Sequence, residues 1–253
     1  MWKLALLVTL TASLLIACGT PATPAPIPTS TPPPPPTQTP VPPTSTATLE
    51  PSPTPDPLIF RDDFDGALDE AWQWIHEKPA YWSLTTESGW LRITARAGGL
   101  NDGTMTNVLV QPAPEGNYEL ETKLNFRPGG NYQLAGLLIY KDDGNTVAFG
   151  RAFCGNSNCS GDGFYFDMVM DGNWNGQNFG TKAPDTNILY LRLRQYGDTY
   201  TASASEDGQT WRLIGVHDKG PLKPIFVGLI SGNAQQSVPR VAAFDYFTIT
   251  ALR

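Results

Sequence analysis

The chain has 253 residues, with 17 Lys and Arg against 24 Asp and Glu, so its formal net charge is −7 at neutral pH. Nucleic-acid binding depends on clustered basic residues, and this balance argues against it. Charged residues make up only 16% of the chain, while Gly and Pro each occur 24 times. A low charge with many Gly, Asn, Thr, Tyr and Trp residues predicts an all-β, extracytoplasmic protein and argues against a cytosolic enzyme.

Residues 1–18 have the features of an export signal. Met1-Trp2-Lys3 is a short positive segment, and residues 4–16 are all apolar or small. This run is too short to span a membrane but suits a signal peptide. It ends in Leu15-Ile16-Ala17-Cys18, which resembles a bacterial lipobox. The resemblance implies that Cys18 becomes the lipidated mature N-terminus, anchoring the protein on the extracytoplasmic side; an ordinary secretory signal with a chance cysteine is the alternative.

Residues 19–57 form a low-complexity segment. Of the 24 prolines in the chain, 16 lie here together with 10 threonines, and the segment has no aromatic residue. Such a composition cannot bury enough apolar surface to offset the entropy of ordering. Proline-rich chain extends by about 3.1 Å per residue, so we expect a disordered linker that reaches up to about 120 Å.

Residues 58–253 are expected to form one β-sandwich domain. In residues 118–126, Tyr118, Leu120, Thr122, Leu124 and Phe126 alternate with charged or polar residues, which predicts a strand with one buried face. At residues 68–74 we expect at most one helical turn. Further strands are expected at residues 82–84, 90–94, 107–110, 134–140, 163–170, 188–196, 199–205, 209–214, 225–230 and 243–249.

Several of these segments carry a family resemblance. Asp62-Asp63-Phe64, Tyr190-Leu191-Arg192-Leu193-Arg194, Ser205 to Trp211 and Phe244-Asp245-Tyr246-Phe247 follow one another in order. They resemble the C-terminal domain of family 43 β-xylosidases. The resemblance implies a concanavalin A-like jelly-roll β-sandwich of two antiparallel sheets in a carbohydrate context. It does not imply catalysis, since the reaction of those enzymes belongs to a separate β-propeller domain.

Catalytic residues are hard to find in this sequence. Glycoside hydrolysis usually needs two carboxyl groups at a fixed separation. Glu119 and Glu121 share a strand face with Lys123, which favours a solvated surface, and Asp171 of the pair Asp167 and Asp171 belongs to a turn. We therefore assign no catalytic residues and expect a non-catalytic module. A glycosidase or polysaccharide lyase with an unrecognised pair remains an alternative.

Two structural features are predicted from cysteine and aspartate positions. Cys154 and Cys159 bracket a short polar loop, and outside the cytoplasm they are expected to form a disulfide. Asp62, Asp63 and Asp245 lie near opposite ends of a domain whose first and last strands commonly neighbour each other. They are a possible structural Ca²⁺ site, although capping of turns is the alternative. No other cofactor is indicated.

A ligand site is expected on a concave sheet, where alternate residues point into a groove. Trp174, an aromatic residue within a polar loop, is the strongest candidate for stacking on a sugar, although it can instead anchor its loop. Core packing is the alternative for most of the others. The further candidates are Trp74, Gln111, Gln133, Tyr140, Arg151, Tyr165 and Asp167.

Together these observations predict a monomeric, membrane-anchored lipoprotein that displays a carbohydrate-binding β-sandwich. Its partner would be a polysaccharide or other glycan, and its contact with the membrane would be through the lipid alone. The alternative is a structural or protein-binding envelope module without a sugar site.

Overall fold

The computed structural model describes residues 56–100, 102–175, 179–218, 220, 222–233 and 238–253. Residues 1–55, with the expected signal, Cys18 and nearly all of the linker, lie outside the described residues. The described part belongs to one compact unit, Ser52–Arg253. Within it, the structure contains no helix long and apolar enough to cross a membrane.

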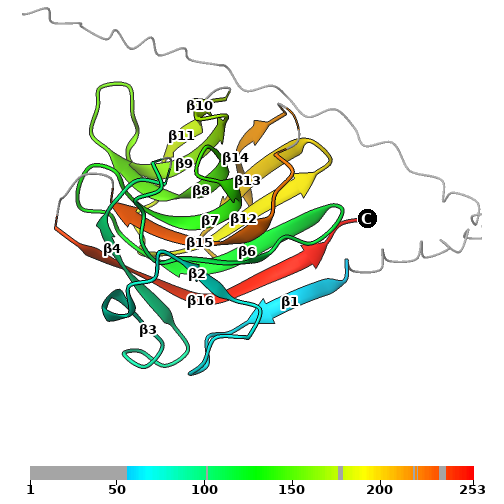
Figure 1. Ribbon diagram of the computed structural model, residues 1–253. Helices are drawn as coiled ribbons and strands as arrows, with labels where there is room; N and C mark the ends of the chain where they lie inside the picture. The colour runs from blue at the N-terminus through cyan, green and yellow to red at the C-terminus, as the bar shows by residue number, and fades with distance from the viewer. Residues whose placement is uncertain (1–55, 101, 176–178, 219, 221, 234–237) are drawn as a thin grey trace, which may run out of the picture. The chain divides into compact units, whose positions relative to one another are not determined.

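The domain is built almost entirely from strands (Figure 1). One 3-10 helix, η1 (Pro79–Tyr81), interrupts them. Within residues 68–74 a single hydrogen-bonded turn forms, in which the amide of Trp72 donates to the carbonyl of Asp69 (3.1 Å). The strands are β1 (Leu58–Asp62), β2 (Gln73–Ile75), β3 (Trp82–Ser83), β4 (Leu91–Ala97), β5 (Val108–Pro112), β6 (Tyr118–Asn125), β7 (Gln133–Asp142), β8 (Asn145–Cys154), β9 (Gly161–Met170), β10 (Asn173–Trp174), β11 (Phe179–Lys182), β12 (Ile188–Tyr196), β13 (Thr199–Ser205), β14 (Arg212–His217), β15 (Phe226–Asn233) and β16 (Arg240–Ala251).

The strands form two layers joined at one edge. The first layer has the order β14-β13-β12-β6-β16-β4, with β1 on β16 and β3 on β4. The second has the order β10-β9-β8-β7-β15-β5-β2, with β11 on β9. Pairing among the described strands is antiparallel, except that β15 and β4 pair in parallel and so link the layers. The predicted all-β jelly-roll sandwich is confirmed.

The core lies between the layers and follows from alternation along each strand. On β6, Leu120 and Leu124 are fully buried, whereas Glu121 and Lys123 face outward, as their spacing predicted. The outward charges are paired: Glu121 lies 2.6 Å from Arg192 of β12. On the second layer the inward residues include Leu137 of β7. Burial of such side chains contributes about 25 cal/mol per Å² of apolar surface removed from water.

Strand β8 was missed in the sequence analysis because a charged residue interrupts its apolar pattern. Val147 and Phe149 point into the core, but the next inward position is Arg151. The arginine is fully buried. An inward arginine removes the alternation of apolar and polar residues by which a strand is recognised.

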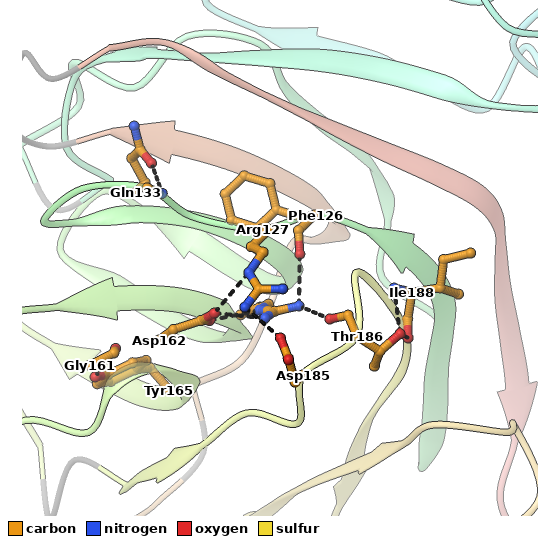
Figure 2. A network of polar contacts seen from close by, with 11 residues as sticks. Phe126, Arg127, Gln133, Gly161, Asp162, Tyr165, Asp185, Thr186 and Ile188 are labelled. Atoms are coloured by element: carbon orange, nitrogen blue, oxygen red, sulfur yellow. Dashed lines mark hydrogen bonds and ion pairs between the residues drawn. The ribbon is translucent and has the colours of Figure 1, made fainter.

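Arg151 connects the two layers through a network of hydrogen bonds. Figure 2 shows the residues that accept them, Phe126, Asp162 and Thr186. Its guanidinium donates two hydrogen bonds of 2.7 Å to the carboxylate of Asp162 on β9. It also donates to the carbonyl oxygen of Phe126 (3.0 Å), just after β6, and to that of Thr186, just before β12. The cation is therefore fully partnered, as a buried charge must be.

Replacing Arg151 by Met should destabilise the domain by about 3 kcal/mol or more, because the partner carboxylate and two carbonyls lose their donor. Arg127 offers a matched control. It pairs with the same Asp162 and with Asp185 but is half exposed, so Arg127→Met should cost less than about 1 kcal/mol. Urea unfolding of both variants measures the difference. Equal losses would contradict the bridging role of Arg151.

Candidate functional site

A groove of about 900 Å³ lies on the outward face of the second layer. Its position follows from strand alternation: residues 164, 166 and 168 of β9 point into the core, so the odd-numbered residues between them face outward. The groove floor is formed by Leu134 of β7, by Thr146, Ala148 and Ala152 of β8, and by Tyr165, Asp167 and Val169 of β9.

Two glycines are paired between β7 and β8, close to the strands that form this floor. Gly136 of β7 is opposite Gly150 of β8 in the ladder. A Cβ atom at Gly136 would lie 2.1 Å from the carbonyl oxygen of Phe149, and one at Gly150 would lie 2.1 Å from that of Ala135. No side chain fits at either position, and both glycines are buried, outside the residues that line the groove.

A small apolar cluster fills the neighbouring part of the same face. Met105 packs with Val108 and Val110 of β5, with Leu138 of β7 and with Ile230 of β15. The cluster covers the side of the face that β5 and β15 form. The expected concave surface is therefore only partly open, and the open part lies over β7, β8 and β9.

Two loops form the walls of the groove. On one side are Gly99, Leu100, Asp102 and Met105, and on the other is the loop closed by the disulfide between Cys154 and Cys159, with Asn156, Asn158 and Ser160. The Asp102 carboxylate accepts hydrogen bonds from the hydroxyl (2.6 Å) and backbone amide (3.1 Å) of Thr104, which lower the pKa of Asp102.

Trp174 lies at the rim because of a tight turn. Asp171 and Gly172 both have positive φ (49° and 74°), as a two-residue hairpin turn requires. The turn pairs Trp174 of β10 with Val169 of β9. The side chain lines the groove, yet Trp174 is 56% exposed. A large aromatic ring is thus held beside the groove with much of its surface open to solvent.

Tyr165 forms a fixed part of the floor. Its hydroxyl donates to the carbonyl oxygen of Gly161 (2.8 Å) and accepts from the amide of Ser160 (3.2 Å). The ring lies against Gly163 and Gly180, where a Cβ atom would come within 3.2 and 3.3 Å of it. Burial raises the pKa of Tyr165. Its ring is available to a ligand, while its hydroxyl is used by the protein.

Asp167 lies at the floor of the groove, opposite Ala148 of β8. Within the described part of the chain, its carboxyl has no hydrogen-bond or ion-pair partner. Burial alone raises the pKa of Asp167 to about 7. Asp102 and Asp167 are the charged residues among the described groove residues, which include no Lys, Arg or His.

Four of the predicted ligand residues point away from the groove: Arg151, Gln133, Gln111 and Trp74. Arg151 is buried in the hydrogen-bond network described above. Gln133 is buried, its carbonyl oxygen accepting from the amide of Gly129 (2.7 Å) and its amide donating to the carbonyl of Val238 (2.6 Å). Gln111 is buried on β5, two residues after the inward Leu109. These side chains occupy inward or capping positions and do not line this groove, so the structure does not bring them together with the other candidates.

The aromatic candidates divide differently. Trp74 packs against the core and against Trp82, with ring centroids 5.0 Å apart, so it is the fourth residue outside the groove. Tyr140 is on the grooved face, but its hydroxyl donates to Asp143 (2.8 Å) and its ring packs beside Phe226 rather than lining the groove. Of the eight candidates, the structure brings together Tyr165, Asp167 and Trp174.

The sequence analysis missed Thr146, Asp102 and the asparagines of the cysteine loop. Thr146 lies on β8, the strand that was not recognised. Asn156 and Asn158 had a readable signal, because the disulfide holds these two amides in one short loop. Asp102 lies far from β8 and β9 in the sequence and reaches the groove only through folding.

The three aspartates considered as calcium ligands have other partners in the structure. Asp62 accepts a hydrogen bond of 2.8 Å from the indole of Trp72, and it also bonds to backbone amides. Asp63 and Asp245 are each paired with a cationic side chain instead. Among the described residues no three His, Cys, Asp or Glu side chains come together as metal ligands would. The bonds of Asp62 to backbone amides correspond to the alternative interpretation, the capping of turns.

The fold and groove define a concanavalin A-like β-sandwich. Residues 61–250 match the family model of the beta xylosidase C-terminal concanavalin A-like domain, and the chain belongs to this family. A search of curated proteins found no match.

Solved structures support the fold. The GH43 protein BlXynB from Bacillus licheniformis aligns with a TM-score of 0.69 and 21% identity, over 76% of this chain and 39% of that one. Xylan beta-1,4-xylosidase from Bacillus halodurans aligns at 0.63 and 20%, over 82% and 41%. A beta-1,3-glucanase from Mycobacterium marinum aligns at 0.51 and 15%, over 76% and 98%. The chain thus spans about two fifths of the two Bacillus proteins.

Asp167→Asn should change how stability depends on pH. An unfolded aspartate has a pKa of about 3.9, so from about pH 4 to pH 7 the folded chain holds a proton that the unfolded chain has lost. Stability from this group is therefore present at low pH and is lost as pH rises through 7. Relative to the Asn variant, the wild type should lose about 2 kcal/mol between pH 5 and pH 8 in urea unfolding.

Asp171→Asn is the control for this measurement. It removes the same charge from an exposed turn four residues away, where Asn tolerates the positive φ. Its stability should follow that of the wild type at both pH values. If Asp167→Asn does so too, the Asp167 carboxyl is not desolvated.

Proposed function

We propose that the protein is a surface lipoprotein whose β-sandwich is a non-catalytic carbohydrate-binding module. The observation that carries the proposal is the open groove with Trp174 at its rim. Membership of a xylosidase-associated family and likeness to GH43 proteins support a glycan as the ligand class.

The groove offers the two kinds of contact that a sugar needs. A flat aromatic ring packs against the C–H face of a pyranose, and the exposed Trp174 supplies one. Hydroxyl groups need hydrogen-bond partners, and the walls and floor supply Asn156, Asn158, Ser160, Thr146 and Asp167. The fixed Tyr165 ring adds a second apolar surface on the floor.

Hydrolysis is the competing function, and one observation favours it. Asp102 and Asp167 line the same groove, and the pKa of one is lowered while that of the other is raised. Separated pKa values are typical of an acid and base pair. Against this, the Asp102 carboxylate already accepts both Thr104 hydrogen bonds. Release of reducing sugar from a polymer that binds the groove would identify hydrolysis.

Display on the surface is proposed from the sequence. A lipid on Cys18 would anchor the chain, and residues 19–57 would hold the module up to about 120 Å from the membrane. A single groove is expected to bind weakly, with a Kd between micromolar and millimolar, or about −4 to −8 kcal/mol. Many copies on one surface would raise the avidity.

Trp174→Ala should weaken binding to a polysaccharide by about tenfold or more, because the stacking surface is lost. The measurement is affinity electrophoresis or pull-down of the full-length protein with xylan, β-glucan and peptidoglycan. Tyr196→Ala is the control, since Tyr196 is as exposed (57%) but does not line the groove. Unchanged binding by the Trp174 variant would remove the ring from the site.

Cys18→Ala should release the protein from the membrane. Acylation needs the thiol, and without the acyl chains the N-terminus has no membrane anchor. Detergent phase separation of the expressed protein measures this. The wild type should enter the detergent phase and the variant the aqueous phase. If both enter the aqueous phase, the lipoprotein assignment fails.

A further inference from the structure

We infer that the groove selects uncharged glycans and rejects chains that carry uronic acids, and that Asp167 is the residue that sets this selectivity. The inference rests on the proposed carbohydrate-binding function and goes further by naming the ligand class. Three features support it. Asp167 lies on the floor of the groove, the described lining contains no cation, and the cationic side chains of neighbouring strands contact other groups.

Asp167 occupies a place that a bound sugar must approach. It is flanked on β9 by the outward Tyr165 and Val169, and Trp174 of β10 pairs with that Val169. Across the ladder it faces Ala148, whose methyl group is too small to cover it. A sugar stacked on Trp174 and lying along the floor would therefore meet the Asp167 carboxyl.

The charged groups around Asp167 leave it without a counterion. Across the groove the charged residue is Asp102, also an acid, and on β9 the titratable neighbour is Tyr165, whose hydroxyl is bonded to Gly161. Neighbouring strands carry cations or titratable groups that turn away. They are Arg151 of β8, bonded to Asp162; His217 of β14, stacked on Phe166; and Arg212 of β14 and Lys182 of β11, which line a separate pocket with Glu206.

Electrostatics then separates two classes of glycan. A neutral sugar can donate two hydroxyl hydrogen bonds to the Asp167 carboxylate. These would satisfy a carboxylate for which the described chain supplies no donor. A uronate would bring a second negative charge into a partly desolvated groove with no cation in its described lining. Like charges repel more strongly there than in water, because the effective dielectric is lower.

The selectivity should depend on pH. Burial raises the pKa of Asp167 to about 7, so its carboxyl is mostly ionised at pH 8 and mostly protonated at pH 5.5. Uronic acids remain ionised at both values. The repulsion is therefore present at pH 8 and is relieved at pH 5.5. Asp102, whose pKa is lowered, stays ionised throughout and does not produce the change.

Matched probes test the inference on the full-length protein. The neutral probes are xylohexaose and cellohexaose; the anionic ones are glucuronate-substituted xylohexaose and cellohexaose oxidised at C6. Titration calorimetry at pH 8 should give affinity for the neutral member of a pair about tenfold or more above that for the anionic member. At pH 5.5, and for Asp167→Asn at both pH values, the ratio should fall to about threefold or less.

Asp171→Asn is again the matched control and should keep the wild-type ratio, and circular dichroism checks that both variants are folded. Equal affinity of wild type for both members of a pair at pH 8 would overturn the inference and leave carbohydrate binding intact. Relief by Asp171→Asn as large as that by Asp167→Asn would overturn the role of Asp167. If no neutral probe binds at either pH, the proposed function fails, and the inference with it.

Discussion

The buried guanidinium of Arg151 is the contact on which the arrangement of the two layers depends. It reaches from β8 to the carbonyls that end β6 and precede β12, and it is held in place by Asp162 on β9. Most of the core is apolar and non-directional, and such packing tolerates sliding. The planar guanidinium is held by four acceptor atoms, and sliding of the layers would break these hydrogen bonds. It therefore sets the position of β8 and β9 against the other layer.

The same strand gives the groove its shape. Inward residues of β8 end in Arg151, while its outward residues are Thr146, Ala148, Gly150 and Ala152, all small. The groove is deep here because the outward side chains of β8 are small. The adjacent Met105 cluster fills the part of the face where larger residues occur.

Alternation along the chain was enough to predict the layers but not which polar residue faces which side. The strand at residues 118–126 was recognised because its charges all lie on one face. Strand β8 was missed and its Arg151 was assigned to the ligand, because a buried cation can be identified only from partners distant in the sequence. Likewise, nothing in the sequence indicates that Gln133 is buried away from the groove, because its partners include the distant Val238. Trp174 could be placed because its turn and its polar loop are local features.

Arg151 and Asp167 lie in the same sheet but differ in how the protein surrounds their charged groups. Both are ionisable residues on neighbouring strands, yet the protein supplies Arg151 with four acceptors and supplies the Asp167 carboxyl with no partner in the described chain. A desolvated carboxyl without a partner costs folding stability once it ionises. Asparagine would fill the same volume without that cost. Such a carboxyl on the floor of a groove is the arrangement that the proposed ligand role would account for, because hydroxyl groups of a ligand can donate the hydrogen bonds that the protein does not supply.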